Sequence, residues 1–134
     1  MNRSEYILDS YALLAYFQAE PKGAKVLNIL KEAAAGTSTA SLSVISLGEI
    51  YYIVACKRGE TQAGAITEAI SRLPIGLVDA TKERVLTAAR VKAQNPFSYA
   101  DAFVVATAIE FTATIVTGDP EFKESESRVA VLWL

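Results

Sequence analysis

Four acidic residues stand where their carboxylates could act together on a bound cation. Asp9 and Asp119 each follow a short run that predicts a strand, and each precedes a segment typical of a helix start. Ligands bind at the carboxyl ends of strands in open α/β sheets, so both side chains would enter one crevice if these strands are neighbours. Glu49 and Asp101 lie on predicted helices. Hard cations such as Mg²⁺ prefer oxygen ligands, and a bound cation can activate water to hydrolyse a phosphodiester.

Three of these acids also suit the starts of helices, and this structural explanation stays open. An Asp before a helix is a good N-cap because its side-chain oxygen accepts an unpaired backbone N–H, which fits Asp9. The same reasoning fits Asp119, because Pro120 after it suits the first position of a helix. Ser98, with Asp101 three residues later, has the spacing of a capping box.

Glu49 is the acid that helix structure alone explains least well. In the predicted helix over residues 44–57, its neighbours three and four positions away are mostly apolar, so its carboxylate lies on or beside the inward face. A charge placed there is unfavourable unless it is paired or bound to a metal. The alternatives are a capping box with Ser46 or an ion pair with Lys57 at the rim of that face.

The composition excludes several common catalytic mechanisms. The 134 residues include no histidine and a single cysteine, Cys56. Ser-His-Asp and Cys-His catalysis, histidine zinc sites, paired-histidine ribonuclease chemistry, internal disulfides and cysteine zinc sites are therefore excluded. Hydrolysis assisted by a metal held on carboxylates needs no histidine, and it is compatible with this chain.

The charge and hydropathy patterns limit the partners and the location of the protein. Its net charge of −2 gives no overall attraction for nucleic acid, so any RNA contact must be local. No apolar run is long enough to span a bilayer. Glu5 and Asp9 interrupt the first apolar stretch, which therefore lacks the pattern of a signal peptide. We expect a cytoplasmic protein that makes no membrane contact.

Some side chains could contact RNA, although most basic residues of a protein belong to ordinary solvated faces. Three tyrosines could stack on unpaired bases, but a place in the core or at a dimer interface is the stronger expectation for Tyr51 and Tyr52. The candidates for phosphate contact are Lys57, Arg58, Lys82 and Arg84, and the tyrosines are Tyr51, Tyr52 and Tyr99.

Strand-like and helix-like segments alternate without a linker or repeat, which indicates a single domain over residues 1–134. This alternation predicts an α/β fold with a mostly parallel five-stranded sheet that helices cover on both faces. The predicted strands are 6–8, 37–42, 75–78, 114–117 and 128–134, and the predicted helices are 10–18, 21–35, 44–57, 62–72, 81–93 and 99–111.

Four segments, taken in order, resemble the PIN-domain family, and most of all the VapC toxins of VapBC toxin–antitoxin pairs. They are Leu8-Asp9-Ser10, Ser46-Leu47-Gly48-Glu49-Ile50, Tyr99-Ala100-Asp101-Ala102 and Val116-Thr117-Gly118-Asp119-Pro120-Glu121-Phe122. The last segment is the most specific, and the resemblance extends over nearly the whole chain. It implies a three-layer α/β/α sandwich and a nuclease that uses Mg²⁺ or Mn²⁺ to hydrolyse single-stranded regions of RNA.

The resemblance also implies roles for individual residues and partners. Small hydroxyl residues, here Ser10 and Thr117, would support the site, while Glu121 and Glu124 receive no role. VapC-like proteins usually form homodimers, and a VapB-like antitoxin inhibits them, often with a peptide across the acidic groove. The residues that take the metal-ligand and catalytic positions are Asp9, Glu49, Asp101 and Asp119.

We therefore expect a metal-dependent endoribonuclease that acts as a toxin. The alternatives are a housekeeping PIN-domain nuclease of RNA processing and a non-catalytic PIN-like binding module. Other Mg²⁺-dependent phosphotransfer folds fit less well. A haloacid-dehalogenase-like phosphatase would have a second Asp where Tyr11 stands, and the chain has no P-loop.

Overall fold

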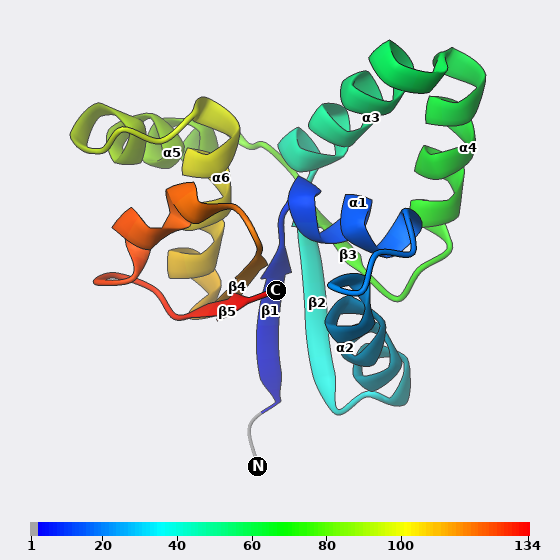
Figure 1. Ribbon diagram of the computed structural model, residues 1–134. Coiled ribbons are helices and arrows are strands. Elements are labelled where there is room, and N and C mark those ends of the chain that lie inside the picture. The colour runs from blue at the N-terminus through cyan, green and yellow to red at the C-terminus, as the bar shows by residue number, and fades with distance from the viewer. Residues whose placement is uncertain (1–2) are drawn as a thin grey trace.

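The computed structural model describes residues 3–134 and contains one sheet with helices on both of its faces (Figure 1). All neighbouring strands are parallel, in the order β3-β2-β1-β4-β5. Because the strands run in one direction, their carboxyl ends meet at one edge of the sheet. The strands are β1 (Ser4–Leu8), β2 (Ser38–Ser43), β3 (Gly76–Val78), β4 (Thr114–Thr117) and β5 (Val131–Trp133).

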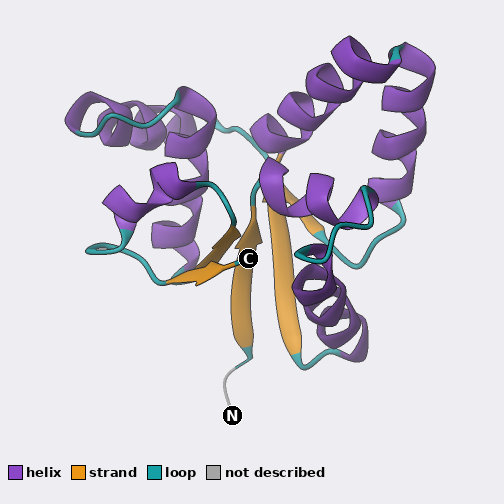
Figure 2. Cartoon of the chain, in the orientation of Figure 1, coloured by secondary structure: helices purple, strands orange, loops and turns teal. Residues whose placement is uncertain are grey.

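The helices form two groups, which Figures 1 and 2 show on the two sides of the sheet. One group is α1 (Ser10–Phe17), α2 (Gly23–Ala35), α3 (Val44–Arg58) and α4 (Glu60–Ser71). The other is α5 (Lys82–Gln94), α6 (Tyr99–Phe111) and the short 3-10 helix η1 (Pro120–Ser125). Within residues 3–134, no helix combines the length and the hydropathy needed to cross a membrane. The expected three-layer α/β/α architecture is confirmed.

The core consists of two apolar clusters, one on each face of the sheet. Ile7 and Ile115 pack with the buried side chains of α5 and α6. The next residues along the same strands, Leu8 and Val116, pack with α1, α2 and α3. This division follows from the strand geometry, because successive side chains point to opposite faces. Because β1 and β4 are apolar at consecutive positions, each contributes side chains to the core on both faces of the sheet.

The predicted order of strands and helices is confirmed, and the differences lie at the boundaries. The last strand is shorter than expected because the backbone N–H groups of Arg128 and Val129 both bond to the carbonyl of Ser125, which forms a turn. Helix α4 begins directly after Gly59, whose φ of +91° favours glycine. The 3-10 helix η1 begins at Pro120 with Asp119 as its N-cap, as the helix-start pattern of these two residues predicts, although residues 120–125 are not among the predicted helices.

Gly23 marks the closest approach of α2 to α1. A Cβ at this position would lie 2.7 Å from the carbonyl oxygen of Ala15 and 2.9 Å from the Cα of Tyr16. Both atoms belong to the backbone and cannot rotate away. We expect Gly23→Ala to lower the free energy of unfolding by about 1–3 kcal/mol, measured by urea denaturation.

Gly64 is the matched control, since it is a helical glycine of α4 and a Cβ added to it would have no atom within 4 Å. Gly64→Ala should leave the stability unchanged or raise it by up to about 1 kcal/mol. Equal effects of the two substitutions would contradict the close contact of the α1 and α2 backbones.

Candidate metal centre

Asp9 lies at the carboxyl edge of the sheet, directly after β1. The pairing of Leu8 with Val116 across β1 and β4 brings the next residues, Asp9 and Thr117, side by side. One Asp9 oxygen accepts a hydrogen bond from the Ala12 N–H at 2.8 Å, as the N-cap of α1. The other accepts the hydroxyl hydrogen of Thr117. Asp9 is therefore a helix cap and also part of the sheet edge.

Thr117 connects Asp9 to the next acid along this edge. The same hydroxyl oxygen accepts a hydrogen bond from the Asp119 N–H at 3.0 Å. The Asp119 carboxylate in turn caps η1 by accepting the Glu121 N–H at 2.9 Å. Thr117 is fully buried, so its hydroxyl bonds to Asp9 away from water. This geometry suits the supporting role that the family resemblance implies for Thr117.

Glu49 reaches the site from α3 and is held by Ser10, the first residue of α1. The Ser10 hydroxyl donates to Oε1 of Glu49 at 2.5 Å. Neither structural alternative for Glu49 occurs: the Ser46 hydroxyl is buried without a hydrogen-bond partner, and the ion pairs found within residues 3–134 do not include one to Lys57. The contact joins the two helices beside the sheet edge.

Asp101 forms only half of the expected capping box. Its N–H donates to the Ser98 hydroxyl at 3.2 Å, as the sequence spacing predicts. The Ser98 N–H donates to Oε1 of Glu121, at 3.0 Å, and not to the Asp101 carboxylate. Glu121 thus has a definite place that sequence reasoning missed. Because Glu121 occupies the return position, the Asp101 side chain is available to the site.

The four predicted acids line one cavity of about 300 Å³. Oxygens of Asp101, Asp119 and Glu121 lie within 4.8 Å of one another, while Asp9 and Glu49 line the same cavity outside this tight group. The only sequence signal for Glu121 was its position two residues after Asp119. The remaining lining residues are Ser10, Tyr11, Leu14, Ile53 and Ser98.

The electrostatics of the cavity favour uptake of a cation. Burial raises the pKa of Asp9 to about 7; the Thr117 and Ala12 hydrogen bonds oppose this rise, and the nearby Asp119 and Glu49 charges add to it. Burial also raises the pKa of Asp101 to about 8, with a hydrogen bond to Glu121 as the next cause. A positive ion would lower both pKa values by favouring the charged carboxylates. Several close oxygen donors fit a hard divalent cation.

Two of the candidate RNA-binding residues lie away from this cavity. Arg84 donates to both carboxylate oxygens of Glu110, at 3.1 and 3.0 Å, and to the carbonyl of Asp79. Glu110 follows Asp101 by nine residues in α6, which corresponds to roughly 13 Å along the helix axis. Lys82 is exposed at the start of α5, and neither basic residue lines the acidic cavity.

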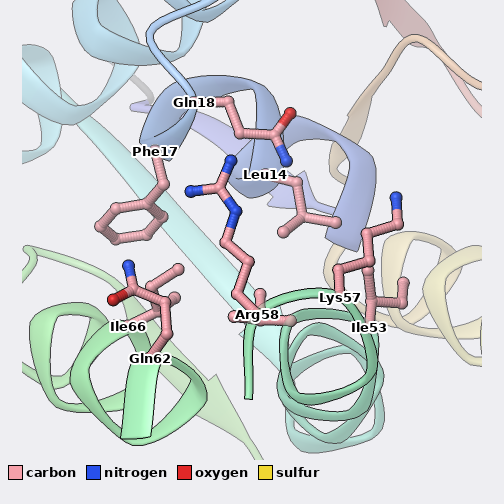
Figure 3. A pocket seen from close by; sticks show the side chains of 9 residues that line it. Leu14, Phe17, Gln18, Ile53, Lys57, Arg58, Gln62 and Ile66 are labelled. Carbon is pink, nitrogen blue, oxygen red and sulfur yellow. The ribbon is translucent and has the colours of Figure 1, made fainter. Parts of the chain in front are cut away.

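The other two candidates, Lys57 and Arg58, line a second cavity between α1, α3 and α4 (Figure 3). Its wall includes the apolar side chains of Phe17 and Ile66, and Figure 3 shows the Arg58 side chain extended across it toward α1. Leu14 and Ile53 line both cavities. The basic cavity is therefore a direct neighbour of the acidic one.

The sequence matches the family described as PIN domain over residues 6–126. The chain belongs to the PIN-domain family. The fold is also that of several VapC-containing structures. The structure of VapBC2 from Rickettsia felis, bound to a promoter DNA fragment, has a TM-score of 0.75 at 17% identity, covering 96% of this chain and 97% of that one.

Two further similar structures are toxins or toxin–antitoxin complexes. DNA-bound VapBC from Salmonella typhimurium has a TM-score of 0.72 at 14% identity, covering 96% of this chain and 97% of that one. VapC20 from Mycobacterium tuberculosis, a toxin that cleaves the sarcin-ricin loop, has a TM-score of 0.68 at 15% identity, covering 91% and 95%. A comparison with curated proteins gives no significant match. At these identities the structural likeness shows a shared fold.

The raised pKa values predict how the stability of the metal-free protein depends on pH. An acid with a raised pKa in the folded state stabilises the fold below its unfolded pKa of about 4, and this contribution is lost as pH rises through the folded pKa. In EDTA, ionisation of these two acids should therefore lower the melting temperature as the pH rises from about 4 to about 8. Asp101→Asn should reduce that fall by about 5 °C, measured by thermal denaturation.

Glu124→Gln is the control, because Glu124 is an exposed carboxylate of η1 and its removal should leave the pH profile unchanged. In the wild type, Mn²⁺ should raise the melting temperature more at the alkaline end of this range than at the acidic end. Parallel pH profiles for Asp101→Asn and the wild type would contradict the raised pKa of Asp101.

Proposed function

We propose that this PIN-domain protein is an endoribonuclease that depends on Mg²⁺ or Mn²⁺ and acts as the toxin of a toxin–antitoxin pair. The observation that carries this proposal is the meeting of four acids from distant segments in one cavity. The fold alone would not specify it, because a common fold supports many functions. The residues assigned to metal binding and catalysis are Asp9, Glu49, Asp101 and Asp119.

The chain's own contacts suggest how these acids would work together. Asp101 and Asp119 would hold the cation from one side, with Glu121 fixing the start of α6 beside them. Thr117 orients Asp9, and Ser10 orients Glu49. A divalent cation would lower the pKa of a coordinated water and stabilise the leaving oxygen of the phosphodiester. This chemistry needs no histidine, which the chain lacks. RNA is the proposed substrate because the sequence resembles the VapC toxins, and VapC20, which shares the fold, is a toxin that cleaves the sarcin-ricin loop.

A VapB-like antitoxin is the proposed protein partner. Several structures of this fold are VapBC complexes, including those from Rickettsia felis and Salmonella typhimurium. The second cavity offers a suitable place for a peptide, because it combines apolar walls with the positive charges of Lys57 and Arg58. An apolar segment that carries acidic residues would complement it. A peptide bound there would also approach the acidic cavity across Leu14 and Ile53.

A homodimer forms part of the same proposal. Tyr51 and Tyr52 on α3 are 38% and 56% exposed, so they are not core residues. Tyr99, at the start of α6, is 44% exposed. Tyrosine is enriched in protein interfaces, and these three side chains are candidates for contact with a second copy.

The nuclease is tested with purified protein and a single-stranded RNA substrate. We expect cleavage with Mg²⁺ or Mn²⁺ and none in EDTA. Asp9→Asn, Asp101→Asn and Asp119→Asn should each lower kcat/KM by about 100-fold or more, because each removes a charged ligand. Thr117→Val should lower it by about 10- to 100-fold, since Thr117 orients one of those ligands.

Glu124→Gln is again the matched control and should retain the wild-type rate. Cleavage that continues in EDTA, or that survives Asp101→Asn unchanged, would defeat the metal-dependent mechanism. Thermal denaturation of every variant separates loss of activity from loss of folding.

The toxin role is tested by controlled expression in a bacterial host. Wild-type protein should arrest growth, whereas the Asp101→Asn variant should not, because its metal site is incomplete. Co-expression of a small protein encoded beside the gene should restore growth, and that protein should co-purify with the chain. Normal growth with active, soluble wild-type protein would instead favour a housekeeping nuclease.

A further inference from the structure

Tyr11 forms part of the wall of the acidic cavity and is held against the loop that carries Asp119. It lies two residues after Asp9, in the first turn of α1, and lines the cavity. Its ring packs directly on Gly118, where an added Cβ would lie 2.3 Å from Cε1 and 2.6 Å from Cζ of the ring. Only glycine leaves room for the ring. Tyr11 therefore has a fixed position between the segments that carry two of the acids.

Lys22 places a positive charge at the hydroxyl end of this ring. Its Nζ donates to the Tyr11 hydroxyl at 2.9 Å and lies 5.5 Å from the ring centroid. Lys22 itself is exposed, at the start of α2. A lysine ammonium has three N–H donors, and this contact uses one of them. The remaining donors can reach a ligand that enters from solvent.

This arrangement adds a cation next to a wall residue of the acidic cavity, in addition to Lys57 and Arg58 in the neighbouring cavity. The carboxylates of the cavity and the phosphates of RNA carry the same sign of charge. Arg84 cannot offset that repulsion there, because Glu110 occupies its guanidinium. Lys22 does not line the cavity itself, but its ammonium contacts Tyr11, which does. A lysine on a rigid support is well suited to bind phosphate as a point charge, without reading sequence.

We propose that Lys22, positioned by Tyr11, binds an RNA phosphate next to the one at the metal centre. Tyr11 is a positioning residue, since it acts through the lysine that it holds. The inference rests on the proposed nuclease function and adds a specific substrate contact to it. The contact acts on substrate binding, so its loss should raise KM and leave kcat nearly unchanged.

The test compares charge removal at two positions along α2. Lys22→Ala should raise KM for a single-stranded RNA by about 5- to 20-fold at about 50 mM salt, with kcat within about twofold. The dependence of log KM on log salt should become shallower by about 0.7, the value for one phosphate contact on a single strand. Lys31→Ala removes an exposed lysine later in the same helix and should change neither quantity.

Two conservative variants distinguish a contact of Lys22 with the substrate from a purely structural role of Lys22 at the turn between α1 and α2. Lys22→Arg should restore most of the affinity and the full salt dependence, because the charge remains. Tyr11→Phe keeps the ring on Gly118 but removes the hydroxyl that holds Lys22. It should raise KM by about two- to fivefold with an unchanged salt dependence, since no charge is lost.

A binding measurement keeps this inference distinct from the proposed function. The same RNA, fluorescently labelled, is titrated with Asp119→Asn protein in Mn²⁺, with and without Lys22→Ala. If the wild type fails to cleave RNA, the proposed function is wrong, but the RNA-binding titration still tests the role of Lys22. Equal affinity and salt dependence with and without Lys22→Ala would overturn the inference, as would an equal effect of Lys31→Ala.

Discussion

The structure depends on holding several carboxylates close together at one edge of a parallel sheet. Such a group is unfavourable when it is empty and fully ionised, because burial and mutual repulsion both oppose the charges. The raised pKa values of Asp9 and Asp101 reflect this unfavourable free energy of ionisation. Protons relieve it in the metal-free protein, and a divalent cation would relieve it near neutral pH. The surrounding hydrogen bonds serve to keep the acids in place under either condition.

The same carboxylate can cap a helix and line the acidic cavity. A carboxylate has two oxygens, and Asp9 uses one for the Ala12 N–H and the other for Thr117. Asp119 likewise caps η1 while it lies in the acidic group. The N-terminal end of a helix also stabilises negative charge. The fold thus uses the starts of helices to orient carboxylates that repel one another.

The basic side chains illustrate why charge in the sequence is a weak guide to a binding surface. Arg84 and Lys22 look similar as isolated solvated residues. In the fold, Arg84 is held by an acid of the next helix, while Lys22 is held by an uncharged tyrosine beside the acidic cavity. The partner of each cation decides whether its charge is available to a ligand. In both cases that partner belongs to another segment, 26 residues away for Arg84 and 11 residues away for Lys22.

The sequence by itself determined the order of the strands and helices, because apolar periodicity, caps and glycine stops are local signals. It also identified the four acids, three of them at helix starts. Only the tertiary structure decided that β1 lies between β2 and β4, which joins Asp9 to Thr117 across 108 residues. It likewise gave Glu121 the capping bond at Ser98 and gave Glu49 its partner Ser10. Strand pairing and contacts between distant side chains arise from the packing of whole layers, which no local pattern specifies.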